Sequence, residues 1–279
     1  MKLTLGFSTC PNDTFIFDAI VNGKVDTAGL EFEVIMADIE ELNRKVLNNE
    51  IDISKISFHA YAYAARKYIL LTSGNALGRK NGPLLIAKRK VFPDEIKNLK
   101  IAIPGKFTTG NLLFSLEFPE ALNKEEYLFS DIEKAILDGK ADAGVIIHEN
   151  RFTYEQKGLK KIIDLGESWE KKTGNPIPLG GITVNRNIDK NTQVKVNRII
   201  KSGIMYAFEN PGSGYSFIKR YAREMDLRVI KRHIDLYVND YTLELGKEGK
   251  NAIRNLYDIA ARKGITEPVP ANIFVTNKP

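Results

Sequence analysis

Residues 142–154 read DAGVIIHENRFTY, and this stretch decides the class of fold expected for the chain. Its first half, from Ala143 to Ile147, is an unbroken run of small and apolar residues, which is typical of a strand covered on both faces of a sheet. The run stops abruptly at His148. Because ligands of open α/β sheets bind beyond the carboxyl ends of strands, His148 stands where a reactive side chain is expected. A solvated or hydrogen-bonded structural histidine is the commoner case at a strand end.

Strand-like and helix-like segments alternate on either side of this stretch. Residues 3–8, residues 30–36 and ISKISF have strand patterns with helical patterns between them, and the alternation begins again with KIAIPG and TTGNLLFSLEF. Such alternation predicts an α/β protein with mostly parallel sheets. Beyond Asn187 the sequence has helical periodicity almost throughout, followed by a tail that we expect to be exposed.

The two rounds of alternation predict two lobes joined by two apolar crossover strands, residues 84–88 and 181–185. We expect a large α/β lobe from residues 1–88 plus 186–279 and a small α/β lobe from residues 89–185. Two lobes joined in this way form the type II periplasmic-binding-protein-like fold. A cleft between such lobes is a common place for a small ligand.

The composition is that of an ordinary globular protein. Of its 279 residues 43% are hydrophobic and 27% are charged, so a stable core needs neither disulfides nor a metal. Cys10 is the single cysteine, which excludes an internal disulfide and fits a reducing compartment. The three histidines, His59, His148 and His233, are far apart in sequence, and no motif has the spacing of a metal site.

Charge and hydropathy narrow the range of partners. The formal net charge is +6, but the basic residues are interspersed with acidic ones, as in KEEYLFSDIEKAILDGK, so nucleic-acid binding is not predicted. A mildly positive surface instead favours a small anionic substrate. Neither a signal core after Met1 nor a run of 18 apolar residues is present, which predicts a cytoplasmic protein with no membrane partner. The sequence carries no signal for an oligomeric state.

Polar residues follow the first two strand patterns. Asn12 and Asp13 precede a helix expected from about Thr14, where free backbone N–H groups favour an anion, although capping is the commoner role of these residue types. Lys55 and Ser57 end the short strand ISKIS. For Ser57, capping of the next helix and contact with a ligand are equally compatible with the pattern, whereas Lys55 has the charge to pair with an acid.

Thr108 and Thr109 lie in GKFTTG, between the strand KIAIP and its helix. Two hydroxyls beside the N–H groups of a helix start form a plausible cradle for a carboxylate. The segment lacks the Walker spacing and GRKNGP lacks GxGxxG, so no nucleotide site is predicted. Because no Ser-His-Asp order or GxSxG turn is present either, His148 is the strongest acid–base candidate; an ordinary imidazole titrates at about pH 6.5 and accepts a proton at neutral pH.

Taken together, several segments resemble the 1,4-dihydroxy-6-naphthoate synthases of the futalosine route to menaquinone. The segments that carry the resemblance are GFSTCPNDTFIF, DISKISFHAYAY, GRKNGPLL, IAIPGKFTTGNLLF, GVIIHENRFTY and DLGESWEKKTGNPIPLGG. They match in order over about residues 3 to 265, nearly the whole chain. Thr9 stands where the family often has proline, a change that we expect to be tolerated.

The resemblance implies a lyase of periplasmic-binding-protein-like fold that works without a cofactor. Such an enzyme splits cyclic dehypoxanthine futalosine into 1,4-dihydroxy-6-naphthoate and dihydroxyacetone. The family's proton-accepting histidine corresponds to His148, in the IIHE segment. The family's substrate-binding segments correspond to Lys55, Ile56 and Ser57, and to Thr108 and Thr109.

Three other functions stay open at this point. Chorismate dehydratase, of the same pathway, shares the fold, but HENRFTY and CPNDTF favour the naphthoate synthase. A small-molecule solute-binding protein has the same architecture but normally carries a signal peptide. The effector domain of a transcription factor is the third alternative, and here no DNA-binding segment is attached.

Overall fold

The computed structural model describes residues 1–222 and 226–276, which fold into two compact units. Unit 1 is built from Met1–Gly78 together with the chain from Pro178 onward, and unit 2 is Arg79–Ile177. The chain therefore leaves unit 1 near Gly78 and returns near Ile177, whereas the sequence pattern placed these boundaries at residues 88 and 185. The difference at the first boundary arises because residues 84–87 pair with strands of unit 2.

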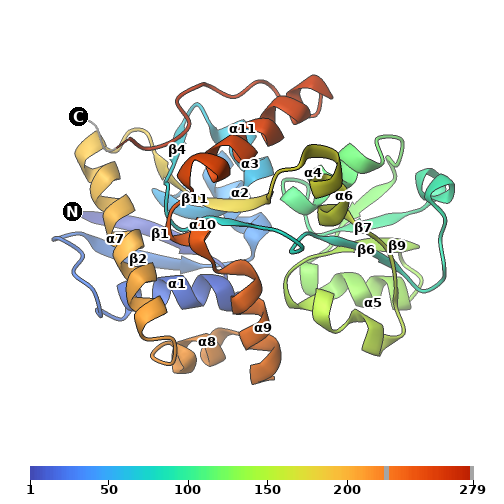
Figure 1. Ribbon diagram of the computed structural model, residues 1–279, viewed down its shortest axis with the longest axis horizontal. Helices are drawn as coiled ribbons and strands as arrows, with labels where there is room; N and C mark the ends of the chain where they lie inside the picture. The colour runs from blue at the N-terminus through green and yellow to red at the C-terminus, as the bar shows by residue number, and fades with distance from the viewer. Residues whose placement is uncertain (223–225, 277–279) are drawn as a thin grey trace. The chain divides into compact units, whose positions relative to one another are not determined.

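Unit 1 contains a six-stranded sheet and helices on both of its faces. Its strands are β1 (Lys2–Phe7), β2 (Glu31–Met36), β3 (Ile53–Ser57), β4 (Tyr68–Leu70), β5 (Ala76–Gly78) and β11 (Ile177–Asn185). Its helices are α1 (Pro11–Val21), α2 (Ile39–Leu47), α3 (Phe58–Ala64), α7 (Lys190–Glu209), α8 (Tyr215–Tyr221), α9 (Leu227–Tyr237), α10 (Asp240–Leu243) and α11 (Gly246–Arg262). In Figure 1, α2 and α3 lie above the strands and α1 lies below them, where it packs against α7, α8 and α9.

The strand directions in unit 1 differ from the expectation of a mostly parallel sheet. The order is β2-β1-β3-β11-β4, with β5 paired to β11. β1 runs parallel to β2 and β3, but β11 runs antiparallel to β3 and β4. The sheet is mixed because β11 is the strand that returns from unit 2, and it enters the sheet from the opposite end.

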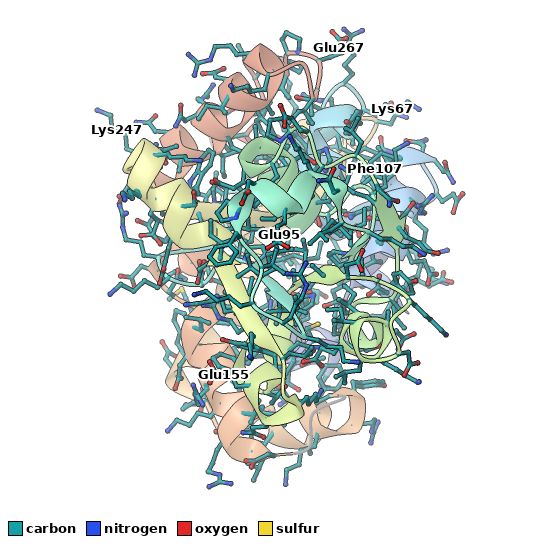
Figure 2. All side chains as sticks on the ribbon, turned by 90° about the vertical axis from the view of Figure 1, so that its right-hand side faces the viewer. Lys67, Glu95, Phe107, Glu155, Lys247 and Glu267 are labelled. Atoms are coloured by element: carbon teal, nitrogen blue, oxygen red, sulfur yellow. The ribbon has the colours of Figure 1, made fainter. Side chains whose placement is uncertain are left out.

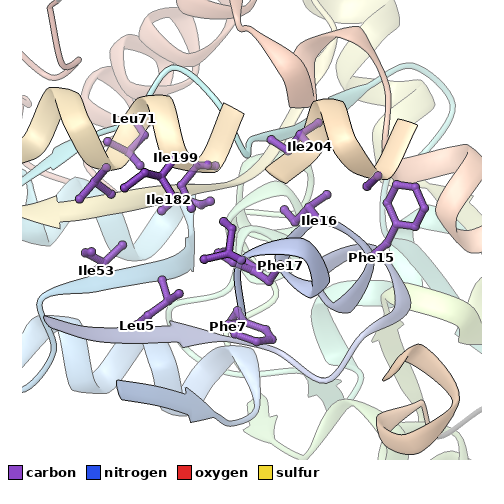
Figure 3. Packing of buried hydrophobic residues seen from close by; sticks show 14 of the residues in the cluster. Leu5, Phe7, Phe15, Ile16, Phe17, Ile53, Leu71, Ile182, Ile199 and Ile204 are labelled. Atoms are coloured by element: carbon purple, nitrogen blue, oxygen red, sulfur yellow. The ribbon is translucent and has the colours of Figure 1, made fainter. Parts of the chain in front are cut away.

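The core of unit 1 lies between this sheet and α1 and α7. Figure 3 shows Leu5 and Phe7 of β1 below Phe17 of α1, and Ile182 of β11 close to Ile199 of α7. The rings of Phe7 and Phe17 stack with their centroids 4.3 Å apart. These contacts fix α1 to β1, so the loop between them has a defined conformation.

Two details of unit 1 correct the sequence-based expectations. Helix α1 begins at Pro11 and not near Thr14, and Cys10 is its N-cap residue, so Asn12 and Asp13 lie inside the helix and do not cap it. Proline suits the first helical position because the N–H that it lacks would have no helical partner there. Within the expected exposed tail, Ile273, Phe274 and Val275 are buried.

Unit 2 contains a five-stranded sheet with the order β10-β6-β9-β7-β8. Its strands are β6 (Leu84–Ala87), β7 (Ile101–Ile103), β8 (Lys124–Glu126), β9 (Ala143–Ile146) and β10 (Lys160–Asp164), and its α-helices are α4 (Thr109–Glu117), α5 (Ile132–Leu137) and α6 (Leu165–Thr173). Short 3₁₀ turns span η1 (Pro93–Asn98), η2 (Phe129–Asp131), η3 (His148–Phe152) and η4 (Tyr154–Lys157). This sheet is also mixed, since β9 is parallel to β7 but antiparallel to β6.

The surface carries charges of both signs, as the composition predicted. Figure 2 shows Lys67, Glu155, Lys247 and Glu267 extending away from the backbone, and all four are exposed. Within residues 1–222 and 226–276, no helix has both the length and the apolar character that crossing a membrane requires.

Candidate functional site

In unit 2, three of the segments that the sequence analysis discussed as candidate sites lie at one edge of the sheet. β9 runs parallel to β7 and antiparallel to β6, and Leu84 pairs with Ile146. The carboxyl ends of β9 and β7 therefore lie at the same edge as the start of β6. This edge carries His148 after β9, the GKFTTG loop after β7 and the NGP loop before β6. The predicted position of His148, just beyond a buried strand, is confirmed.

His148 has an unusual backbone conformation. It is the first residue of η3, and its φ is +59°, which lies in the left-handed region that non-glycine residues adopt rarely. Such strain, on the order of 1 kcal/mol, persists only where the surroundings impose it, and it clusters at functional sites. The imidazole and the ring of Phe129 pack edge to face, with centroids 4.8 Å apart. The turn therefore places the imidazole against Phe129.

The turn that follows His148 is anchored to α5. Asn150 donates a hydrogen bond of 2.8 Å to Oε2 of Glu133, and Lys157 donates one of 2.6 Å to the same oxygen. Glu133 is only 3% exposed, so this carboxylate needs its partners inside the protein. The buried acid thus holds the η3 turn and the end of η4 in place.

Arg151 anchors the same turn on the side of β6. Its guanidinium donates to the carbonyl of Gly82 at 2.5 Å and to Oδ2 of Asp164 at 3.2 Å. Asp164 also caps α6 by accepting from the N–H groups of Gly166 and Glu167. Gly82 and Gly166 pack so closely that a Cβ on Gly82 would lie 2.3 Å from the Cα of Gly166. The NGP loop, η3 and the start of α6 therefore form one connected structure.

Thr108 and Thr109 begin helix α4 at this edge. Thr108 is the N-cap: its hydroxyl donates to the carbonyl of Gly105 at 2.8 Å and accepts from the N–H of Asn111. Thr109 is the first helical residue and is buried. Gly110 brings the helix against β9, because a Cβ there would lie 3.3 Å from Ile147. Both threonines are thus near the strand that presents His148, and Thr108 contributes its hydroxyl to the cap.

In unit 1, Lys55 lies inside the sheet. It is two positions from the core residue Ile53, so both side chains point to the face that α1 covers. Lys55 is only 4% exposed, and its ammonium donates to the carbonyl of Gly74 at 2.6 Å and lies 3.7 Å from Oδ1 of Asp13. Burial lowers the pKa of Lys55, and the charge of Asp13 opposes that shift. The ammonium thus has a hydrogen-bond acceptor in Gly74 and an opposite charge in Asp13.

The neighbours of Lys55 form a buried polar cluster. Asp13 accepts from Nδ2 of Asn12 at 2.9 Å and from the hydroxyl of Ser8 at 2.7 Å. Oδ1 of Asn12 is 2.8 Å from Nε2 of His233, on α9. Asn12 therefore has a partner inside unit 1 at each end of its carboxamide. A contact of Asn12 with substrate stays a prediction.

Ser57 ends β3 next to Asn43 of α2. Its N–H donates to Oδ1 of Asn43 at 2.9 Å, and its hydroxyl lies 3.3 Å from Nδ2 of the same side chain. Ser57 is the N-cap residue of α3, but its hydroxyl makes no capping hydrogen bond to that helix. Ile56 is fully buried in β3. Substrate contacts of Lys55, Ile56 and Ser57 stay predictions.

Sequence reasoning found His148 but missed the residues that hold it. Glu133, Asn150, Arg151 and Asp164 read as ordinary charged and polar positions, and only the fold brings them together. His233 was not among the predicted site residues. Among the residues that the structure describes, no group of three His, Cys, Asp or Glu side chains is placed to bind a metal ion.

The sequence is similar to a family of known proteins and to two named relatives. A family described as menaquinone biosynthesis matches residues 3–262. A 1,4-dihydroxy-6-naphthoate synthase from Thermus thermophilus is 37% identical over 273 residues, which cover 98% of this chain and 99% of that protein. The synthase of the same name from Streptomyces coelicolor is 37% identical over 274 residues, covering 96% of this chain and 95% of that protein.

Solved structures agree on the fold. A crystal structure of a protein from Archaeoglobus fulgidus superposes with a TM-score of 0.89 at 37% identity and covers 95% of this chain and 98% of its own. The alkanesulfonate-binding protein SsuA of Xanthomonas axonopodis pv. citri superposes with a TM-score of 0.72 at 10% identity, covering 98% of this chain and 96% of its own. The second likeness concerns the fold alone, and it confirms the predicted periplasmic-binding-protein-like architecture.

Proposed function

The chain belongs to the menaquinone-biosynthesis family, and from that premise we propose that it is a 1,4-dihydroxy-6-naphthoate synthase. In this proposal it splits cyclic dehypoxanthine futalosine into 1,4-dihydroxy-6-naphthoate and dihydroxyacetone, a carbon–carbon lyase reaction without a cofactor. The observation that carries the proposal is the backbone of His148, which contacts from α5 and β10 hold in a left-handed conformation beyond β9. A fold keeps such strain where a side chain must point in one direction.

We assign the role of general base to His148. The imidazole accepts a proton from the sugar-derived part of the substrate, the bond between that part and the ring carbon breaks, and aromatisation of the ring drives the reaction. Positioned proton transfer of this kind contributes about 10²–10⁴-fold to a rate. The ring contact with Phe129 supports the assignment because it limits the rotation of the imidazole.

Two sets of residues are assigned to binding, each described within its own unit. Thr108, Thr109 and the N-terminal end of α4 would hold the naphthoate carboxylate, since that end of a helix favours an anion. Lys55, Ile56 and Ser57 would hold the sugar-derived part, with the buried ammonium of Lys55 as the charged donor. Charge-assisted hydrogen bonds of this kind are the stronger ones in a water-poor site.

The test is product formation from cyclic dehypoxanthine futalosine by the wild type and by His148→Ala, with no metal or nucleotide added. Release of naphthoate by the wild type alone supports the reaction and the base. Equal activity of the two proteins removes His148 from the mechanism. Turnover of chorismate in place of this substrate would favour chorismate dehydratase, and tight binding without turnover would favour a solute-binding protein.

A further inference from the structure

The polar cluster around Lys55 extends to α9, a helix that carries no role in the proposed mechanism. We infer that His233 is a positioning residue that holds Lys55 in place for the substrate through Asn12 and Asp13. His233 is fully buried, and its Nε2 lies 2.8 Å from Oδ1 of Asn12, 221 positions away in the chain. The inference rests on the proposed function, in which the Lys55 ammonium binds the substrate.

The hydrogen bonds of the cluster have a defined direction. The carboxylate of Asp13 accepts only, so the Asn12 group that faces it at 2.9 Å must be the amide Nδ2. Oδ1 of Asn12 then faces His233, and an oxygen acceptor requires that Nε2 of His233 carries the proton. His233 therefore donates to Asn12, and Asn12 donates to Asp13.

Asp13 depends on this chain for its orientation. One of its oxygens is held by Ser8, whose hydroxyl and N–H lie 2.7 Å and 3.3 Å away. The other oxygen, Oδ1, receives Asn12 and lies 3.7 Å from the Lys55 ammonium. At that separation Asp13 acts on Lys55 through charge, and a rotation of the carboxylate would change the distance between the two charges.

A second helix fixes the other side of Lys55. The carbonyl of Gly74 accepts the short hydrogen bond from the ammonium, and Asn197 of α7 holds the preceding backbone by accepting from the N–H groups of Thr72 and Ser73 at 2.9 and 3.2 Å. Gly74 has φ +84°, and a Cβ there would lie 2.1 Å from Ile182. The Gly74 side is thus held by contacts that do not involve His233, so in this inference His233 acts on Lys55 through Asp13.

The test compares His233→Leu with His233→Gln in steady-state turnover of cyclic dehypoxanthine futalosine. Leucine removes the donor, whereas glutamine carries an amide N–H at the position of Nε2. We expect His233→Leu to raise KM about tenfold, the loss typical of one buried partner, and to leave kcat close to the wild-type value. His233→Gln should restore most of the KM. Ile230→Val, a packing change at a buried position of the same helix, should leave KM unchanged.

Two results would overturn the inference: a wild-type KM for His233→Leu, or a KM for His233→Gln as high as that of the leucine variant. If the leucine variant does not fold, His233→Asn replaces it, because the amide of asparagine reaches only the position of Nδ1 and cannot donate to Asn12 from the position of Nε2.

A double-mutant cycle adds a readout that a purely structural role would not move. In a Lys55→Met background, His233→Leu should have no further effect on KM; additive effects contradict the proposed coupling.

The failure of the inference can be separated from the failure of the proposed function. If the wild type does not turn over the substrate, the proposed function is wrong, and the same four proteins of the cycle are then compared by urea unfolding, which needs no substrate. Non-additive shifts of the unfolding midpoint support the link between His233 and Lys55. Additive shifts refute it.

Discussion

Replacement of Gly82 by alanine tests how firmly the fold holds the turn that carries His148. A Cβ at position 82 would lie 2.3 Å from the Cα of Gly166 and 2.6 Å from its nitrogen. Carbon atoms in contact prefer about 3.5–4.0 Å, so the NGP loop or the start of α6 must move by about 1 Å or more. The carbonyl of Gly82 is a hydrogen-bond acceptor of Arg151, so this movement is transmitted directly to η3.

Two magnitudes follow from this displacement. Overpacking against backbone costs about 1–3 kcal/mol of the free energy of unfolding. A displacement of about 1 Å of a catalytic group lowers a rate by up to about 100-fold. For Gly82→Ala we therefore expect a folded protein of reduced stability whose kcat falls by about 10- to 100-fold, with a smaller change in KM, because the residues assigned to binding lie in other segments.

The assay is steady-state turnover of cyclic dehypoxanthine futalosine combined with urea unfolding. Gly158→Ala is the matched control: Gly158 has φ +77°, but a Cβ there meets no atom within 4 Å. Alanine at position 158 therefore costs about 1 kcal/mol of backbone strain without displacing a neighbour, and kcat should remain at the wild-type value. A wild-type kcat for Gly82→Ala, or an equal loss in both variants, would refute the reasoning.

Three further predictions concern single side chains. Thr109→Val should raise KM more than it lowers kcat, because the hydroxyl is assigned to binding; steady-state kinetics with a normal KM and a collapsed kcat would contradict this. Burial lowers the pKa of Lys55 below its usual 10.5, so KM should rise with pH before 10.5 is reached, whereas a KM that stays constant to pH 10.5 would argue against a charged Lys55. Between the lowered pKa of Lys55 in the folded protein and 10.5, the unfolded chain keeps the Lys55 proton more tightly than the folded protein does. The free energy of unfolding, measured with urea, should therefore increase with pH in that range. Asn150→Ala removes a partner of the buried Glu133 and should cost about 1.5–3 kcal/mol of unfolding free energy. Lys157→Met should cost only about 0–1 kcal/mol, because the Lys157 side chain is 48% exposed. Equal losses in the two variants would show that burial of the partner does not matter.

The position of His148 was predictable from the sequence, but its conformation was not. The apolar run of β9 ends at Ile147, and the end of a buried strand is visible as a change of pattern. The left-handed backbone depends on contacts with Glu133, Gly82 and Asp164. Those residues come from three separate segments, and no local pattern links them to position 148.

Two other differences between the sequence-based predictions and the structure also arise from contacts between residues far apart in the chain. Asp13 looks like a helix cap in the sequence, but its carboxylate is hydrogen-bonded to Ser8 and lies within the helix that starts at Pro11. His233 lies on one face of an amphipathic helix, where a histidine normally packs without a special role. Its neighbour Asn12 is 221 positions away, so only the fold reveals the pair.

The insertion of unit 2 into the sequence of unit 1 has a consequence for synthesis on the ribosome. β11 pairs with β3 on one side and with β4 on the other, yet it is translated only after the whole of unit 2. Until β11 emerges, β3 and β4 expose unpaired N–H and C=O groups, which are templates for association with other nascent chains. Unit 2 is continuous in sequence and can complete its sheet first. A chain that stalls before Ile177 would therefore present one unit with its sheet complete and one with open strand edges.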